Sequence, residues 1–305
     1  MMEKAMASRQ QLAKKTTGLS KREKIVQYYE EAGPDYESWS PSFNMHFGWY
    51  DFKLNPLNRE AMLNRMNEEV MNRLQIKNEV GSIIFDMGCG LGAVSRYIAK
   101  RKENICLHGV TIVPWQVKKA QALTEKENLA ERVFIQEADY SCTPASPRSV
   151  DGAFAIESSC YANGRNKRDF IREAARILKP GKILVIADGF LKAEIKGSFL
   201  KSIYQNLCKA WVLRELGNIN DVKDCLTEEG FQDIVIEDIS WRVAVSVAHV
   251  PFIVIWFLIK TMVKEGKMLS KERLNNLAGP LLTMVLGLHR KHFSYYLITA
   301  TKSKK

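Results

Sequence analysis

The sequence predicts an α/β protein built on a doubly wound parallel sheet, and three observations support this fold class. Short apolar runs alternate with amphipathic helical patterns through most of the chain, as in parallel sheets covered by helices. The apolar run Ile83–Asp86 is followed by three glycines at alternate positions and then by a helical pattern. The 305 residues, 46% of them hydrophobic, are enough for one large domain with a lid.

The expected elements follow in order from this first strand, which leads into a helix from Ala93 to Arg101. Further helices are expected over 114–129, 169–178, 192–216 and 221–229. Further strands are expected over 105–111, 132–138, 151–157, 182–188, 231–239 and 293–301. Pro180-Gly181 is expected to end the helix before the strand at 182–188, because proline and glycine commonly follow the last turn of a helix.

The glycine loop after the first strand predicts a nucleotide-type pocket at the carboxyl edge of the sheet. Glycines let the backbone turn tightly and approach a ligand, and the following helix offers free N–H groups in its first turn. The loop lacks the Gly-Lys-Ser/Thr of a phosphate-binding loop and the G-x-G-x-x-G spacing of a dinucleotide site. Asp86, just before the glycines, would repel a pyrophosphate but would suit an ammonium group.

An aspartate before G-x-G-x-G resembles motif I of the class I S-adenosylmethionine-dependent methyltransferases. The resemblance implies S-adenosyl-L-methionine as cofactor and a Rossmann-like seven-stranded sheet whose last strand runs antiparallel. It implies that four residues surround the methionine end of the cofactor: Asp86, Gly88, Gly90 and Gly92. No metal site is expected, since the six cysteines show no C-x-x-C spacing.

A second segment resembles the second-strand motif of tocopherol, cyclopropane-fatty-acid and related lipid methyltransferases. It spans Gly109–Gln116, and the resemblance implies that Thr111 and Gln116 lie near the ribose or methionine portion of the cofactor. By analogy with the same family, Tyr28 is expected to line the mouth of the cofactor site. Burial of a helix is the alternative for Tyr28.

A third segment, Glu137–Tyr140, resembles the motif whose aspartate bonds the adenine amino group of the cofactor. The resemblance implies cofactor contacts for Asp139 and Tyr140. The alternative for Asp139 is a loop-initiating role, because an aspartate readily hydrogen-bonds nearby backbone.

Glu157 is the expected catalytic residue. Its carboxylate follows an otherwise apolar strand at the edge where open α/β sheets bind ligands, and burying it is costly unless it is paired or functional. It could stabilise a carbocation and accept its proton, or orient an amine or phenol. The alternative is a cap on the following turn or a contact with the cofactor alone.

Two further catalytic candidates accompany this carboxylate. His46 is a candidate base, with packing in its aromatic segment as the alternative. Tyr161 is a candidate because it follows Glu157 by four residues in the loop over the site.

Two segments point to a narrower group within the family. Ala155–Ala162 resembles stretches of the sterol C-methyltransferases and the geranyl diphosphate C-methyltransferases. Phe43–Tyr50 resembles a segment of the γ-tocopherol methyltransferases and their amine-methylating relatives. The resemblance to the family runs from about Tyr28 to Lys302, and it does not select one subfamily.

The region between the last two expected strands is unusually apolar. Residues 243–259 contain no Lys, Arg, Asp or Glu, and they fall just short of a membrane span. We expect a helical lid over an apolar substrate chamber, with peripheral contact to a membrane surface. A helix buried against the sheet without a function is the alternative.

The domain organisation follows from these assignments. We expect a basic flexible tail over 1–20, a helical cap over 21–80, a cofactor-binding core over 81–240, an apolar lid over 241–292, and a final strand with a basic tail over 293–305. The net charge is +11, but the sequence contains no recognised nucleic-acid-binding module. We therefore expect no nucleic acid as partner. The apolar region of a signal peptide is absent and the cysteines are unpatterned, so we expect a cytoplasmic protein. The oligomeric state is not predicted.

The function that fits these features best is methyl transfer from S-adenosylmethionine to carbon of an isoprenoid or sterol-like small molecule. The first alternative is an N- or O-methyltransferase of the tocopherol-like group, acting on an amine or phenol. Cyclopropane formation is disfavoured, because the bicarbonate-binding stretch typical of those enzymes is not recognisable. A non-catalytic lipid-binding protein with the same fold is a further alternative, against which the intact Asp86–Gly92 loop argues.

Overall fold

The structure is a computed structural model, and it describes residues 19–77, 79–265, 269 and 271–304. The predicted basic tail therefore lies outside the described residues except for Leu19 and Ser20. The first helix within the described residues, α2 (Lys21–Ala32), begins where Ser20 and Glu23 form a capping box, in which each side chain hydrogen-bonds the other residue's backbone N–H.

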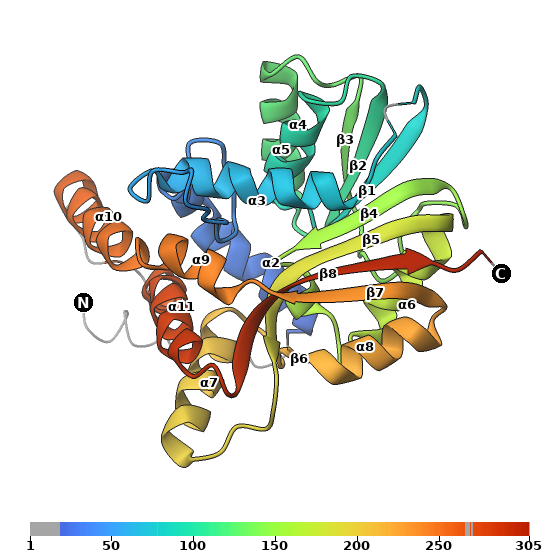
Figure 1. Cartoon of the computed structure of the whole chain (residues 1–305). Coiled ribbons are helices and arrows are strands. Elements are labelled where there is room, and N and C mark those ends of the chain that lie inside the picture. Colours follow the sequence, from blue (N-terminus) through green and yellow to red (C-terminus); the bar gives the residue numbers. More distant parts are fainter. Residues whose placement is uncertain (1–18, 78, 266–268, 270, 305) are drawn as a thin grey trace.

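A twisted sheet of eight strands, counted over the described residues, forms the centre of the molecule (Figure 1). The main path has the order β3-β2-β1-β4-β5-β8-β7, and the two-residue strand β6 (Gly217–Asn218) pairs with β5. The strands of the main path are β1 (Ser82–Met87), β2 (Ile105–Thr111), β3 (Val133–Glu137), β4 (Val150–Ile156), β5 (Leu178–Leu191), β7 (Phe231–Asp238) and β8 (Phe293–Lys302). Neighbours from β3 to β5 are parallel, whereas β8 runs antiparallel to β5 and β7. The predicted doubly wound sheet with an antiparallel last strand is confirmed.

Helices cover both faces of the sheet because successive strand residues point to opposite sides. On one face, Ile84 and Val185 pack beneath α3 (Arg59–Arg73), α4 (Ala93–Ala99) and α5 (Pro114–Lys126). On the other face, Phe85 and Leu184 pack beneath α6 (Arg168–Ile177) and α8 (Ile219–Glu228). The two layers leave the carboxyl ends of β1, β2 and β4 free to form a site.

The strand after α6 begins earlier than expected. β5 begins at Leu178, directly after α6, so Pro180 and Gly181 lie inside the strand. The pairing of β5 with β4 shifts register between Val150 and Gly152, and this irregularity accommodates a proline that cannot donate to the ladder. The expected helix over 192–216 is shorter in the structure, where α7 spans Ser198–Ala210.

The apolar region between β7 and β8 forms three helices, α9 (Ser240–Val247), α10 (Val250–Glu265) and α11 (Lys271–Leu288). They lie at one end of the sheet, and α11 packs against α7 (Figure 1). By length and composition alone, Ser240–Val263 could cross a membrane, with a mean hydropathy of 2.1 and 28% of the window buried. A turn at Ala248 and His249 divides this segment into two helices, which argues against a single membrane-spanning helix.

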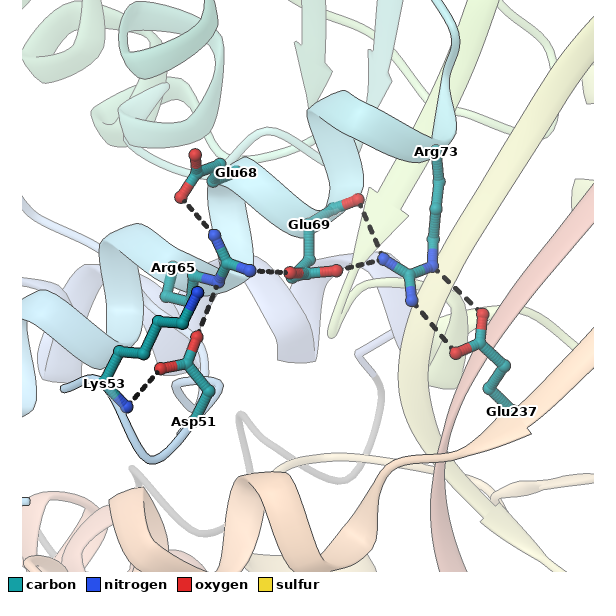
Figure 2. Close-up of polar contacts among 7 residues, drawn as sticks. All are labelled: Asp51, Lys53, Arg65, Glu68, Glu69, Arg73 and Glu237. Atoms are coloured by element: carbon teal, nitrogen blue, oxygen red, sulfur yellow. Dashed lines mark hydrogen bonds and ion pairs between the residues drawn. The ribbon is translucent and has the colours of Figure 1, made fainter.

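Helix α3 is fixed between the N-terminal loop and the sheet by a chain of ion pairs (Figure 2). Six charged side chains form it: Asp51, Arg65, Glu68, Glu69, Arg73 and Glu237. Arg73 donates to both carboxylate oxygens of Glu237 on β7, at 3.1 and 3.0 Å. These ion pairs therefore link the loop at Asp51, the helix α3 and the edge strand β7 of the sheet.

Candidate active site

Two neighbouring cavities lie at the carboxyl edge of the sheet. The glycine-loop cavity has a volume of about 400 Å³ and is lined by the loop after β1 and the ends of β2 and β4. The aromatic cavity has a volume of about 140 Å³ and is lined by α2, the segment 36–47 and α11. Five residues line both cavities and form their junction: Tyr29, Met45, His46, Glu157 and Tyr161.

The glycine loop needs its glycines for steric reasons. Gly88 and Gly90 have φ values of 101° and 51°, a region that side chains other than glycine rarely adopt. A Cβ at Gly88 would lie 2.4 Å from Cβ of Ser158. Gly92, at φ 71°, is the N-cap of α4 and does not line the cavity, so its role is to turn the chain into the helix.

Asp86 is the buried acid of this loop. Its side chain accepts a hydrogen bond of 2.7 Å from Ser95 Oγ, and it has no ion pair among the described residues. Burial raises the pKa of Asp86 to about 7. An ammonium group in the cavity would restore the charged form, which is the chemistry that motif I implies.

Residues on the neighbouring strands complete this cavity. Thr111 Oγ1 donates to Gln116 Oε1 at 2.6 Å, so the two predicted side chains lie together at the end of β2. Asp139 lines the cavity as well, but its Oδ1 accepts from the backbone N–H and hydroxyl of Ser141, at 2.8 and 2.7 Å. Asp139 therefore has the loop-initiating role that was the alternative expected from the sequence. It also lines the cavity, so it can contact a ligand as well. Tyr140 donates to the Ser158 carbonyl at 3.1 Å.

One predicted cofactor residue lies in the other cavity. Tyr28 is buried in α2, lines the aromatic cavity rather than the glycine-loop cavity, and donates a hydrogen bond to Asn276 Oδ1. The other predicted cofactor residues, except Gly92, line the glycine-loop cavity.

Glu157 stands at the junction in a strained backbone conformation. It directly follows β4, and its φ of 49° is a left-handed value that costs energy for a residue with a side chain. Its N–H donates to the Ala187 carbonyl at 2.9 Å, which holds this conformation. Its Oε1 accepts from Phe47 N at 2.6 Å and from Tyr295 Oη at 2.9 Å. Burial outweighs these bonds and raises the pKa of Glu157 to about 8.

His46 is neutral and has a free lone pair at the same junction. Its Nδ1 donates to the Phe47 carbonyl at 2.9 Å, because a carbonyl can only accept. Burial lowers the pKa of His46 to about 4, so Nε2 carries a lone pair at neutral pH. Nε2 is buried and makes no well-formed hydrogen bond among the described residues, although the nearby Asn67 side chain raises the pKa of His46 against the effect of burial. It can accept a proton or a hydrogen bond from a ligand.

Tyr161 lies in the loop above Glu157, and a buried lysine holds that loop. The hydroxyls of Tyr161 and Tyr29 lie 3.0 Å apart. Lys167 Nζ donates to the carbonyls of Cys160, Ala162 and Glu215, at 3.2, 2.9 and 2.9 Å. The Lys21 ammonium on α2 also donates to the Tyr161 carbonyl, so two lysines hold this loop.

Sequence reasoning missed several residues of the aromatic cavity. Tyr295 reaches Glu157 from β8, 138 positions along the chain. Trp39, Asn44, Arg59 and Asn276 also line the cavity, and they come from segments far apart in the sequence. Asn44 lies in the family-like segment 43–50, whereas the sequence holds no local signal for Trp39, Arg59 or Asn276.

The residues of the glycine-loop cavity fit the implied cofactor. The buried Asp86 carboxylate has no cationic partner among the described residues and could pair with the ammonium group of the cofactor. The glycine positions leave the backbone open to close approach by the cofactor. The resident group S-adenosyl-L-methionine carries both an ammonium and a bulky adenosine that a volume of about 400 Å³ can hold.

Comparisons with known proteins show similarity to methyltransferases. A family model described as "Methyltransferase domain" matches residues 84–181. An O-methyltransferase of Pyrenophora dematioidea is 32% identical over 200 residues, which cover 65% of this chain and 72% of that protein. The chloroplastic tocopherol O-methyltransferase of Arabidopsis thaliana is 27% identical over 237 residues, covering 73% of this chain and 67% of that protein.

Solved structures share the fold at low sequence identity. The cyclopropane synthase MmaA2 of Mycobacterium tuberculosis has a TM-score of 0.77 at 15% identity, covering 92% of this chain and 98% of that one. The geranyl diphosphate C-methyltransferase of Streptomyces coelicolor A3(2) has a TM-score of 0.67 at 14% identity, covering 93% and 99%. The chain belongs to the class I S-adenosylmethionine-dependent methyltransferases, and its cofactor is S-adenosyl-L-methionine.

Proposed function

We propose that this methyltransferase transfers a methyl group to carbon of a hydrophobic small molecule of the isoprenoid or sterol-like class. The observation that carries the proposal is the junction, where the Glu157 carboxyl stands between the cofactor cavity and a cavity walled by aromatic rings. When bound, S-adenosylmethionine supplies a methyl group on a positively charged sulfur. The aromatic walls position an apolar acceptor against it and exclude water.

The residues at the junction have the properties that C-methylation of an alkene requires. An alkene carbon that gains a methyl group leaves a carbocation, which must then lose a proton. Aromatic faces and a carboxylate stabilise such a cation, and the carboxylate can accept the proton. Phe47 N–H and Tyr295 Oη hold the Glu157 carboxyl in place at 2.6 and 2.9 Å. A cation beside it favours its ionised form against the burial that raises its pKa.

A second candidate, methylation of a phenol or other hydroxyl, is favoured by one specific observation. The unpartnered Nε2 lone pair of His46 lies at the same junction and could take the proton of a hydroxyl group. The relatives named as O-methyltransferases support this alternative. O-methylation would use the same cofactor and the same acceptor cavity as C-methylation. The base would be His46 instead of Glu157.

We also propose that the protein is cytoplasmic and binds peripherally to membranes through α10. Six large apolar side chains form what we call the α10 outer face: Phe252, Ile255, Trp256, Ile259, Met262 and Val263. Phe252 is 74% exposed and Trp256 67% exposed, whereas Val254 and Phe257 on the opposite side are buried. Helices α9 and α10, over residues 240–265, carry three basic residues and one acidic residue, a balance that suits a lipid surface.

The acceptor atom can be identified with methyl-labelled S-adenosylmethionine. The purified protein is incubated with panels of isoprenoids, sterols, tocopherol precursors, fatty acids and aromatic amines, and the label is located by mass spectrometry. Label on carbon of an isoprenoid or sterol is the expected result. Label on oxygen or nitrogen would replace the first proposal with the second class of acceptor, and His46→Ala would then be expected to abolish O-methylation while Glu157→Gln spares it.

A further inference from the structure

Unpartnered buried polar atoms gather in the aromatic cavity. Ten buried side-chain nitrogen or oxygen atoms lack a hydrogen-bond partner among the described residues, and five of them belong to residues that line this one cavity. The five atoms are Trp39 Nε1, Asn44 Nδ2, His46 Nε2, Arg59 Nε and Asn276 Nδ2. Leaving so many groups unpaired is costly, so their concentration here points to a ligand that pairs with them.

The chemistry of these atoms is one-sided. An indole nitrogen, two amide nitrogens and a guanidinium nitrogen can only donate, and only His46 Nε2 accepts. Four of the five residues line the aromatic cavity and not the glycine-loop cavity, so the cofactor does not satisfy them. A ligand that fits them presents acceptor oxygens, and an ammonium group would meet four donors and is disfavoured.

Arg59 adds a net positive charge to this set. It lies at the start of α3, donates from Nη1 to the Trp39 carbonyl, and stands over the Trp39 ring with 5.8 Å between the guanidinium carbon and the ring centroid. It makes no direct ion pair within the part of the chain that the structure describes, although the Glu60 and Glu157 carboxyls are near enough to attract its charge. The carboxyls of Glu157 and Asp188 line the same cavity but are hydrogen-bonded to other donors. A half-buried guanidinium that faces a cavity with a free Nε and makes no direct ion pair can bind an anion.

We infer that Arg59, with Trp39 and Asn44, forms a subsite for an anionic oxygen group on the methyl acceptor, a carboxylate or a phosphate ester. The inference rests on the proposed function, and it narrows the acceptor class to an amphipathic molecule with an apolar chain and an acidic head.

Ligand binding without turnover tests the subsite. The probes are geranic acid, geranyl monophosphate, geraniol and geranylamine, titrated by calorimetry into the full chain saturated with S-adenosylhomocysteine. One of the two anions should bind about tenfold or more tightly than geraniol, the scale of one charge-assisted hydrogen bond. Whichever anion binds more tightly identifies carboxylate or phosphate as the head group.

Three variants assign the preference to the subsite. Arg59→Met should remove the advantage of the anion and leave the affinity for geraniol within about twofold. Arg242→Met is the matched control, because Arg242 also stands over a tryptophan ring, Trp49 at 5.7 Å, but does not line the cavity. Trp39→Phe keeps the ring under Arg59 and removes only the indole N–H, so it should lower the anion's affinity by a smaller factor even if Arg59→Met folds poorly.

The outcomes separate the subsite from the proposed function. Equal binding of anion and alcohol by the wild type, no binding of any probe, or an anion preference that survives in Arg59→Met would each overturn the subsite. An anion preference that depends on Arg59, combined with label on nitrogen or on no acceptor in the methyl-transfer assay, would keep the subsite and overturn C-methylation.

Discussion

At the scale of single residues, Glu157 concentrates the features of a reactive group. It combines a left-handed backbone, a raised pKa and a place between two cavities, and each of these is costly for a residue that only packs. The hydrogen bonds from Phe47 and Tyr295 fix which oxygen faces the protein, so the other oxygen is available to a ligand.

Glu157→Gln should lower kcat by roughly a hundredfold or more, the scale of lost acid–base or electrostatic help. The amide keeps the shape and the two accepted hydrogen bonds, so the Kd of S-adenosylmethionine should stay within about threefold. Steady-state kinetics and calorimetry measure the two quantities. Near-normal turnover in the glutamine variant would remove Glu157 from the chemistry.

The same substitution should change how stability depends on pH. The folded protein holds the Glu157 proton up to a pKa of about 8, whereas a free glutamate loses it near 4.5. The native state therefore binds more protons between these values, and wild-type stability contributed by this group is lost as pH rises from about 4.5 to about 8. In thermal unfolding of the cofactor-free protein, the Tm of Glu157→Gln should rise relative to the Tm of the wild type between pH 5 and pH 8.5. A Tm difference that is constant over this range would contradict the raised pKa.

At the scale of elements, the buried ammonium of Lys167 is one of the groups that hold the loop after β4. Lys167 Nζ contacts three carbonyls, two of them in the loop that carries Tyr161. Lys167→Met would leave these acceptors unpaired in the interior, so the free energy of unfolding should fall by about 1–3 kcal/mol. Urea titration measures the loss, and Lys201→Met, on the exposed side of α7, is the control. A loss no larger than that of the control would show that the loop is held by other contacts.

Elements of this fold differ in how far the sequence predicts them. The glycine loop and the ends of β2 and β4 were predictable because their signals are local, a short strand followed by turn residues. Tyr295 and Arg59 were not, since their roles arise only when β8 and α3 meet β4 in space. The start of β5 was misjudged because Pro180 commonly ends helices, and the register shift that absorbs it has no sequence signature.

At the scale of the whole molecule, the α10 outer face is an exposed apolar surface on a chain with a net charge of +11. α10 projects at one end of the protein, away from the sheet (Figure 1). α11, which lines the aromatic cavity, packs against α10. A lipid held at this end would therefore lie near the wall of the acceptor site.

The protein should sediment with vesicles that contain anionic phospholipid, and more weakly with neutral vesicles of phosphatidylcholine. Replacing both Phe252 and Trp256 by aspartate should abolish sedimentation. Val80→Asp is the matched control, because Val80 is 88% exposed and lies just before β1, at the opposite edge of the sheet from the site. Unchanged sedimentation of the double variant would exclude the α10 outer face as the contact.

The position of β8 affects the order in which the sheet can form during synthesis of the chain. β8 lies between β5 and β7, although it follows both in the sequence, so β7 has no neighbour in the sheet until residues 293–302 arrive. On the ribosome, the parallel strands of the sheet can assemble first, whereas β7 cannot pair until β8 has been synthesised. Tyr295 arrives with β8, and so the hydroxyl that holds Glu157 is among the last groups to reach the site. A nascent chain can thus acquire its cofactor loop well before it can carry out catalysis.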